Sequence, residues 1–235
     1  MNFEIKNVFL TIEGKSIVND VSIKVCPGEI VGLMGPNGAG KTSTFNLAVG
    51  NLKPDKGDIL MNSKSIKNLP LPSRAKLGLG YLTQEASIFR DLTVKENIDL
   101  ALHNSFFSRA IVRNKREKII NEFNLNKVVD NYGYQLSGGE RNRVHLAKML
   151  KEGGKVLLLD EPYEGLAPVI VDEIEKTLNV IKEQGITTVI VEQNAVRALE
   201  LADRSVILDT GGVVFDGTAK EVLDNSELRA EYLAI

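Results

Sequence analysis

The residues of this chain that could do chemistry begin with a glycine-rich loop. It fits the pattern G-x-x-x-x-G-K-[ST] with one more hydroxyl residue after it, and its members are Gly35, Pro36, Asn37, Gly38, Ala39, Gly40, Lys41, Thr42 and Ser43. Glycines let successive backbone N–H groups curl around a phosphate, where side chains would block the approach. Lys41 would reach the β- and γ-phosphates of a nucleoside triphosphate, and the Thr42 hydroxyl would hold Mg²⁺. The pattern therefore predicts a site for ATP or GTP.

A pair of carboxylates is the second group of interest. Asp160 and Glu161 directly follow the apolar run at residues 156–159. Such a run predicts a parallel strand buried on both faces, and ligands bind at the carboxyl ends of such strands. Asp160 would support Mg²⁺ through its water shell, and Glu161 could orient or deprotonate an attacking water. Asp-Glu is common at ordinary strand ends, but together with the phosphate loop it indicates nucleotide hydrolysis.

A third motif lies at the start of a predicted helix over residues 141–150. Its members are Ser137, Gly138, Gly139 and Glu140. A serine before two glycines presents a hydroxyl and unobstructed N–H groups, which suits a phosphate. The plainer alternative is a capped helix without a ligand, and the motif taken by itself favours that interpretation.

The elements that must position these residues follow a mixed pattern. Residues 1–84 alternate strand-like runs with glycine and proline turns, residues 85–151 have mostly helical spacing, and strands alternate with helices over residues 152–235. Strands separated by helices predict a parallel sheet covered on both faces. We therefore expect a single α/β domain with a nucleotide-binding core (1–84 and 152–235) and a helical insertion (85–151).

Composition limits the classes of protein that remain. The chain has 235 residues, 43% of them hydrophobic, and a net charge of −2, so no global field attracts nucleic acid and none is expected as a partner. Cys26 is the only cysteine, which excludes an internal disulfide and suits a reducing compartment. No run of eighteen apolar residues predicts a membrane span. We expect a cytoplasmic protein that reaches the membrane only through a partner.

The three motifs, together with Gln84, occur in the order and spacing of the ATP-binding-cassette (ABC) ATPases, and the resemblance covers nearly the whole chain. It implies a P-loop NTPase fold: a RecA-like α/β core with an antiparallel β subdomain, plus an inserted α-helical subdomain. It implies ATP and Mg²⁺ as cofactors and ATP hydrolysis as the reaction. Gln84 resembles the Q-loop glutamine, which reaches Mg²⁺ and the attacking water.

The resemblance also implies partners. Two subunits, as a homodimer or a pair with a related ATPase, would face each other head to tail. ATP would then lie between the phosphate loop of one subunit and residues 137–140 of the other. Integral membrane transporter subunits would hold the pair at the inner face of the cell membrane, where closure and release of the dimer become a mechanical signal.

Three positions depart from the family pattern. The aromatic residue that stacks on adenine is replaced by Ile12, the D-loop aspartate by Ala167, and the switch histidine by Gln193. A glutamine amide can still donate a hydrogen bond to the γ-phosphate, but it carries no charge. His145 lies outside the switch position and is interpreted as a packing or surface residue of its helix.

Two branches of the family compete for the cargo. Residues 69–90 resemble the ATPases of lipopolysaccharide-export transporters, whereas residues 165–168 and 191–195 resemble those of branched-chain amino acid importers. The resemblance implies that the segment after Gln84 forms the groove for the membrane partner, so we give export more weight. A soluble ABC ATPase without a membrane subunit, and a subunit that no longer hydrolyses ATP, remain as alternatives of another class.

Overall fold

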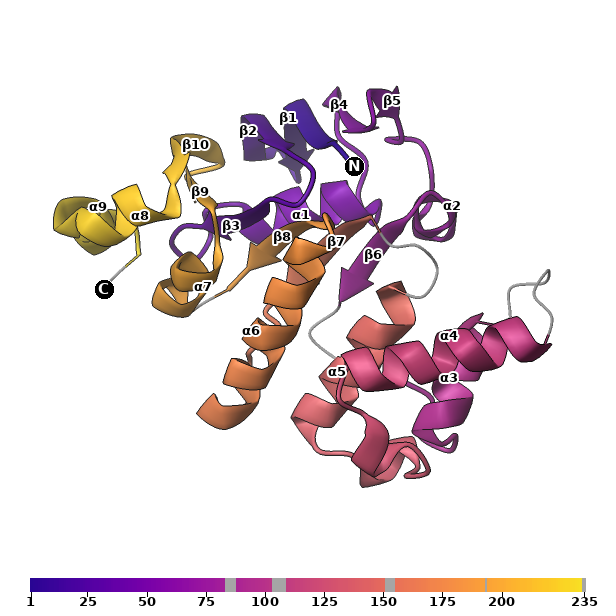
Figure 1. Ribbon diagram of the computed structural model, residues 1–235. Coiled ribbons are helices and arrows are strands. Elements are labelled where there is room, and N and C mark those ends of the chain that lie inside the picture. The colour runs from indigo at the N-terminus through magenta and orange to yellow at the C-terminus, as the bar shows by residue number, and fades with distance from the viewer. Residues whose placement is uncertain (83–87, 103–108, 151–154, 193, 234–235) are drawn as a thin grey trace.

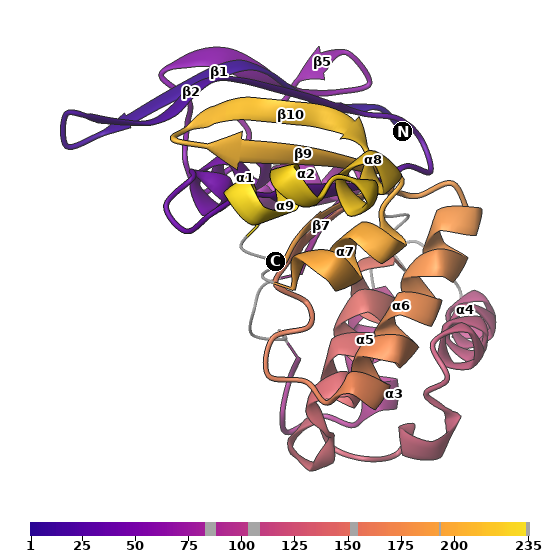
Figure 2. The ribbon, with the colours of Figure 1, turned by 90° about the vertical axis from the view of Figure 1, so that its left-hand side faces the viewer.

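The computed structural model describes residues 1–82, 88–102, 109–150, 155–192 and 194–233. Gln84 and Gln193 lie outside this part of the chain. The described strands form two sheets, one mostly parallel and one antiparallel, and helices surround the parallel sheet (Figures 1 and 2). This arrangement confirms the expected P-loop NTPase fold.

The parallel sheet holds the strands that were predicted to carry the site. Its order is β10-β9-β3-β8-β7-β6, in which β9, β3, β8, β7 and β6 run parallel and β10 pairs antiparallel with β9 at the edge. The bounds are β3 Ile30–Met34, β6 Leu79–Leu82, β7 Val156–Asp160, β8 Thr187–Val191, β9 Arg204–Asp209 and β10 Gly212–Thr218. Because β3, β8, β7 and β6 are neighbours, their carboxyl ends meet at one edge.

The antiparallel sheet has the order β2-β1-β4-β5. Its strands are β1 Phe3–Ile12, β2 Lys15–Val25, β4 Lys56–Met61 and β5 Lys64–Ser65. The pairing of β1 with β2 shifts register three times between Ile5 and Thr11, so side chains do not alternate strictly between the two faces of this strand. One face of this sheet packs against the parallel sheet and α1.

The helices fall into two groups, as Figure 1 shows. Those of the part that contains the two sheets are α1 Lys41–Val49, α2 Leu71–Lys76, α6 Pro168–Glu183, α7 Ala195–Leu201, α8 Ala219–Asp224 and α9 Ser226–Tyr232. Those between β6 and β7 form the helical part of the chain and are α3 Val94–Leu102, α4 Arg109–Glu122, the short 3₁₀ helices Asn126–Val128 and Gly133–Gln135, and α5 Gly138–Leu150.

Strand β7 separates two apolar clusters. Val156 and Leu158 lie in the cluster that contains α1 and the antiparallel sheet, whereas Leu157 and Leu159 lie in the cluster that contains α3, α5 and α6. All four side chains are fully buried. This is the alternation of a strand covered on both faces, as the unbroken apolar run predicts.

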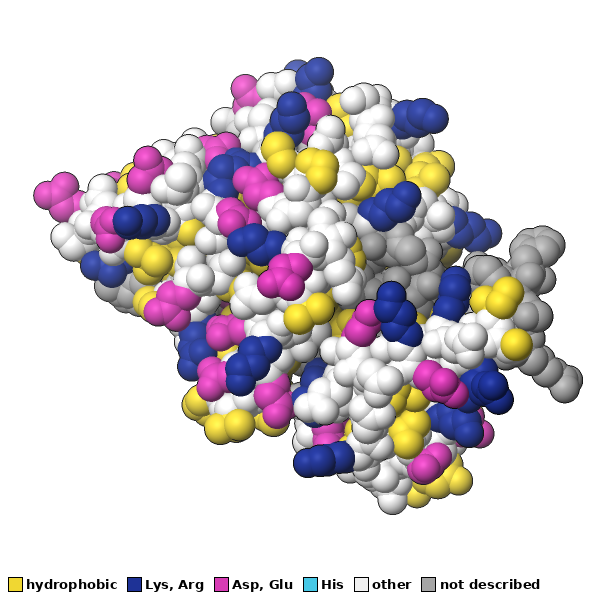
Figure 3. Space-filling view, viewed as in Figure 1, with side chains coloured by type: hydrophobic (Ala, Val, Ile, Leu, Met, Phe, Trp, Pro, Cys, Tyr) yellow, Lys and Arg dark blue, Asp and Glu magenta, His cyan; other side chains and the backbone are white. Residues whose placement is uncertain are grey.

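The helical part has a capped first helix and a charged surface. The Thr93 hydroxyl accepts from the Glu96 N–H at 3.2 Å, and the Glu96 carboxylate accepts from the Thr93 N–H at 2.8 Å, a capping box at the start of α3. On α4, Arg116 forms an ion pair of 2.6 Å with Asp99 of α3. Acidic and basic side chains are interspersed on the face shown in Figure 3, in keeping with a solvated surface.

Among the helices that the structure describes, none has the length and apolar character needed to cross a bilayer.

Candidate functional site

The phosphate loop connects β3 to α1 and has the predicted strand–loop–helix context. Gly35 has φ 134° and Gly40 has φ 96°, both in the region that side chains rarely adopt. A Cβ on Gly35 would lie 2.0 Å from the Leu208 carbonyl oxygen, and one on Gly40 would lie 2.7 Å from that of Ile17. Around Gly38, by contrast, the space is open. Glycine therefore lets the loop pack closely at two points and leaves its tip accessible.

Lys41 begins α1 and its ammonium group lies beneath the loop. Nζ donates to the carbonyl oxygens of Gly35 at 2.6 Å and of Pro36 at 2.8 Å. Partial burial lowers the pKa of Lys41, and the negative charge of Glu161 raises it in part. A cation held between loop carbonyls and a carboxylate is positioned for a polyphosphate.

A cavity of about 290 Å³ brings the two main motifs together. Its lining comprises Ile17, Asn37, Gly38, Ala39, Gly40, Lys41, Thr42, Ser43 and Glu161. Residues more than a hundred positions apart in the sequence therefore face one space, because β3 and β7 both border β8 in the sheet. The cavity places a carboxylate opposite the glycines and hydroxyls expected to hold a triphosphate.

Asp160 ends β7 next to this cavity. Tyr81 of β6 donates to its Oδ2 at 3.5 Å. Burial first and the neighbouring Glu161 second raise the pKa of Asp160, since both disfavour its negative charge. A divalent cation would relieve this repulsion, and Mg²⁺ commonly binds through one carboxylate, a hydroxyl and phosphate oxygens. Asp160 and Thr42 thus fit a Mg²⁺ site completed by a nucleotide.

Glu161 has an unusual backbone. Its φ of 49° lies in the left-handed region, which costs a non-glycine residue about 1 kcal/mol or more. Its N–H donates to the Val191 carbonyl of β8 at 2.8 Å. Two further contacts hold the turn: the Asn142 amide of α5 donates to the Pro162 carbonyl at 3.2 Å, and Tyr163 N–H donates to Glu192 Oε1 at 2.6 Å. Strained backbone that is fixed by its surroundings is typical of functional sites.

Residues 137–140 form a capping box at the start of α5. The Glu140 carboxylate accepts from the N–H and the hydroxyl of Ser137, each at 2.8 Å, and the Ser137 hydroxyl accepts from the Glu140 N–H at 3.3 Å. The two glycines also admit neighbouring side chains, since a Cβ on Gly138 would lie 2.9 Å from Leu166 Cδ2. The plainer alternative, a capped helix, is therefore realised, and any phosphate contact would add to it.

The motif at the start of α5 lies apart from the cavities described above and below. Ser137, Gly138, Gly139 and Glu140 are absent from the linings of three cavities that contain Lys41 or Glu161. This separation within one chain agrees with the expectation that a second subunit completes the site.

The remaining predicted residues have different placements. Ile12 ends β1, is 40% exposed, and is absent from the cavity that its neighbour Ile17 of β2 lines. Ala167 precedes α6 and is exposed. His145 is buried in α5, which agrees with its interpretation as a packing residue, and burial lowers its pKa to about 4. The roles expected of Gln84 and Gln193 concern positions outside the described residues.

Two residues of this site were missed by sequence reasoning. Ile17 was overlooked because nothing in its local pattern shows that β2 passes beside the phosphate loop. Glu192 was overlooked although it carries the same signal as Glu161, an acidic residue directly after a buried strand of the parallel sheet. It is only 5% exposed and lines a cavity of about 280 Å³ together with Lys41.

Comparison with protein sequences agrees with this geometry. The family model described as ABC transporter matches residues 18–164. The lipopolysaccharide export system ATP-binding protein LptB of Haemophilus influenzae and that of Escherichia coli K12 are each 39% identical to this chain, over 97% of it and 95% of their own length. The protein of the same name from Acidithiobacillus ferridurans is 38% identical over the same shares.

Comparison with solved structures shows the same fold. The protein cbiO1 of Clostridium perfringens, part of the ABC transporter complex cbiONQ, has a TM-score of 0.88 at 25% identity, covering 97% of this chain and 93% of that one. The cassette MJ0796, solved as a dimer after hydrolysis with ADP and phosphate, has a TM-score of 0.78 at 24% identity, with coverage of 92% and 98%. The chain belongs to the ABC transporter family, as an ATP-binding subunit that hydrolyses ATP.

Proposed function

We propose that this chain acts as a homodimer that hydrolyses MgATP to drive lipopolysaccharide export through separate membrane subunits. The observation that carries the hydrolytic part is the shared cavity of Glu161 and the phosphate loop. The cargo is inferred from the relatives named for lipopolysaccharide export, which match 97% of the chain.

The chemistry would divide among the residues as follows. Lys41 would neutralise charge on the β- and γ-phosphates, while Thr42 and Asp160 would hold Mg²⁺, which supplies further charge stabilisation when bound. Glu161 would orient the attacking water and accept its proton. Residues 137–140 of the second subunit would contact the γ-phosphate, so that hydrolysis needs the closed dimer.

The membrane partner would bind near the start of the helical part. Phe89 is 53% exposed and Lys148 of α5 lies over its ring, 5.0 Å from the centroid. Phe89 also belongs to the segment that resembles export ATPases. An exposed aromatic ring held in place by a cation is suited to a protein contact.

Depletion of the protein in its own cells tests the cargo. We expect newly made lipopolysaccharide to remain in the inner membrane, and to reach the cell surface again when the unaltered chain, but not Glu161→Gln, is supplied. Normal lipopolysaccharide export in depleted cells would contradict the proposal. The importer alternative rests on residues 165–168 and 191–195 and predicts instead reduced leucine uptake in the same cells.

A further inference from the structure

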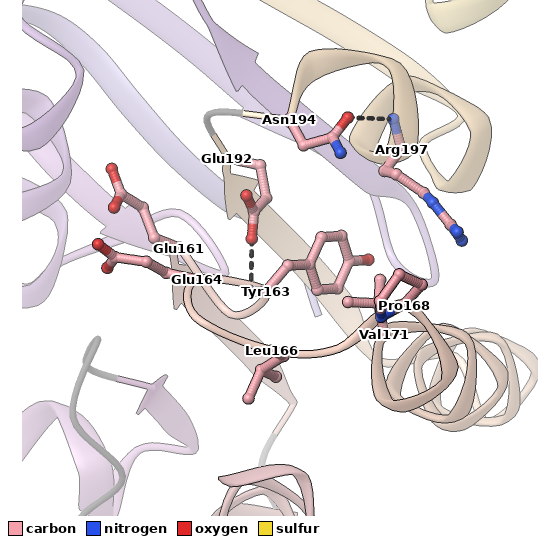
Figure 4. A pocket seen from close by; sticks show the side chains of 9 residues that line it. All are labelled: Glu161, Tyr163, Glu164, Leu166, Pro168, Val171, Glu192, Asn194 and Arg197. Atoms are coloured by element: carbon pink, nitrogen blue, oxygen red, sulfur yellow. Dashed lines mark hydrogen bonds between the residues drawn. The ribbon is translucent and has the colours of Figure 1, made fainter.

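The turn that carries Glu161 is in contact with another acidic side chain, the buried Glu192. Consecutive residues at the end of β8 each accept one backbone N–H from this turn: the Val191 carbonyl accepts from Glu161 at 2.8 Å, and Glu192 Oε1 accepts from Tyr163 at 2.6 Å. Figure 4 shows the Glu192 side chain pointing toward the backbone of Tyr163, while the Glu161 side chain extends to the other side of the turn. Glu192 therefore contacts the turn on the side opposite to the Glu161 side chain.

The bond from Tyr163 to Glu192 is short and lies in a buried place. It joins a side-chain carboxyl oxygen to a backbone N–H at 2.6 Å, and a hydrogen bond is electrostatically stronger inside a protein than in water. Glu192 is 5% exposed, so water competes little for its oxygens. The bond is well suited to fix a backbone conformation that is otherwise unfavourable.

Such a conformation is present in the turn. Glu161 has a φ of 49°, and a left-handed non-glycine residue persists only where its surroundings enforce it. If the turn relaxed, the Glu161 carboxylate would move relative to the phosphate loop. Displacements of about 1 Å at a reacting group can lower the rate about a hundredfold.

Glu192 also connects two cavities. It lines the one of about 280 Å³ that contains Lys41, and the one of about 320 Å³ that contains Glu161 and Tyr163. The residue thus lies between the phosphate loop and the turn, and its printed hydrogen bond goes to the turn.

We infer that Glu192 is a positioning residue for hydrolysis, which acts by holding the turn that aims Glu161 at the nucleotide. The inference rests on the proposed role of Glu161. It assigns to Glu192 an effect on the rate of hydrolysis but not on the binding of ATP, because its bond goes to the backbone of the turn.

Three substitutions at Glu192 separate the effect of side-chain length from the effect of charge. Glu192→Gln keeps an oxygen at the same distance, so we expect kcat within about threefold of the unaltered value. Glu192→Ala removes the acceptor and Glu192→Asp is one methylene too short, so both should lower kcat about tenfold to a hundredfold, with KM for ATP within twofold. The Asp variant maintains the test if the Ala variant does not fold.

Thr188→Val is the matched control. Thr188 lies on the same strand, is 1% exposed, and its hydroxyl has no hydrogen-bond partner among the described residues. We expect unchanged kcat and KM. Equal loss of kcat in Thr188→Val and Glu192→Ala would show a general effect of altering β8 and would overturn the inference.

A double-mutant cycle tests the route through Glu161. In a Glu161→Gln background, Glu192→Ala should lower the residual rate by less than twofold, since the group it positions is already removed. Additive losses, or an unchanged kcat in a folded Glu192→Ala variant, would overturn the inference. An unaltered rate in Glu161→Gln alone would instead refute the proposed catalytic role of Glu161, so the two failures are distinguishable.

Discussion

A Cβ atom on Gly139 would lie 1.9 Å from Cγ2 of Ile170, so the second glycine of the motif at the start of α5 is also the point where α6 packs against this helix. The same glycine is expected to present an open N–H group to a nucleotide held by the second subunit. Packing and binding therefore constrain one position, and a substitution there alters both.

Gly139→Ala should lower the free energy of unfolding by about 1–3 kcal/mol, the usual cost of an overpacked contact. Ile170→Ala removes the clashing atoms and should restore part of this loss when combined with Gly139→Ala. Urea unfolding of the single and double variants measures the coupling. Losses that simply add would contradict the packing role of Gly139.

Glu161→Gln should reduce ATP hydrolysis about a hundredfold or more while ATP binding persists, because an amide is a far poorer base than a carboxylate. The variant should accumulate as a closed dimer with MgATP, which light scattering detects. A turnover rate equal to that of the unaltered chain would refute the assignment, and would favour a different residue as the base.

Lys41→Ala and Ser137→Ala should affect different steps. Lys41→Ala removes the cation nearest the phosphates and should weaken ATP binding by the isolated chain. Ser137→Ala should leave that binding intact but prevent dimer closure, with a loss of about 1 kcal/mol in stability from the missing cap. Titration with labelled ATP, paired with light scattering, separates the two. Equal loss of ATP binding in both variants would contradict the two-subunit site.

His145 should make stability depend on pH. Burial, with the nearby charge of Lys148 as a smaller cause, lowers its pKa to about 4 from 6.5, so the unfolded chain binds a proton between these values that the folded chain does not. The free energy of unfolding should thus decrease as the pH falls from about 6.5 to 4, by on the order of 3 kcal/mol in total. His145→Leu should lack this contribution. Stability curves of the two proteins that run parallel over this range would contradict it.

The sequence predicts most of this site where the chemistry is carried by neighbouring residues. The apolar run before Asp160 fixes a buried strand, and that strand places both carboxylates at the ligand edge of the sheet. Likewise the glycines and Lys41 define their own loop. In both cases the residues that form the local structure are also those that place the functional side chains.

Sequence reasoning misses contacts that depend on how distant elements pack. The face of β1 that Ile12 occupies cannot be counted from alternation, since the β1–β2 pairing shifts register three times, and nothing local shows that Ile17 lines the cavity beside the phosphate loop. Strand β10 was not predicted either, because its residues are half-buried or exposed and lack a clear apolar period. Contacts such as that of Glu192 with Tyr163 become visible only in three dimensions.

The apolar cluster shared by the parallel sheet and the helical part limits how members of this family can be recombined. Leu159 of β7 and Leu146 of α5 lie in this one cluster, so the helical part completes the core beside the sheet that carries the phosphate loop and Asp160. A chimera that took this part from another transporter to change its membrane partner would also need compatible residues on β7 and α6. An exchange of the helical part would therefore also alter the packing around β7, and a stable chimera should require compensating changes on β7 and α6.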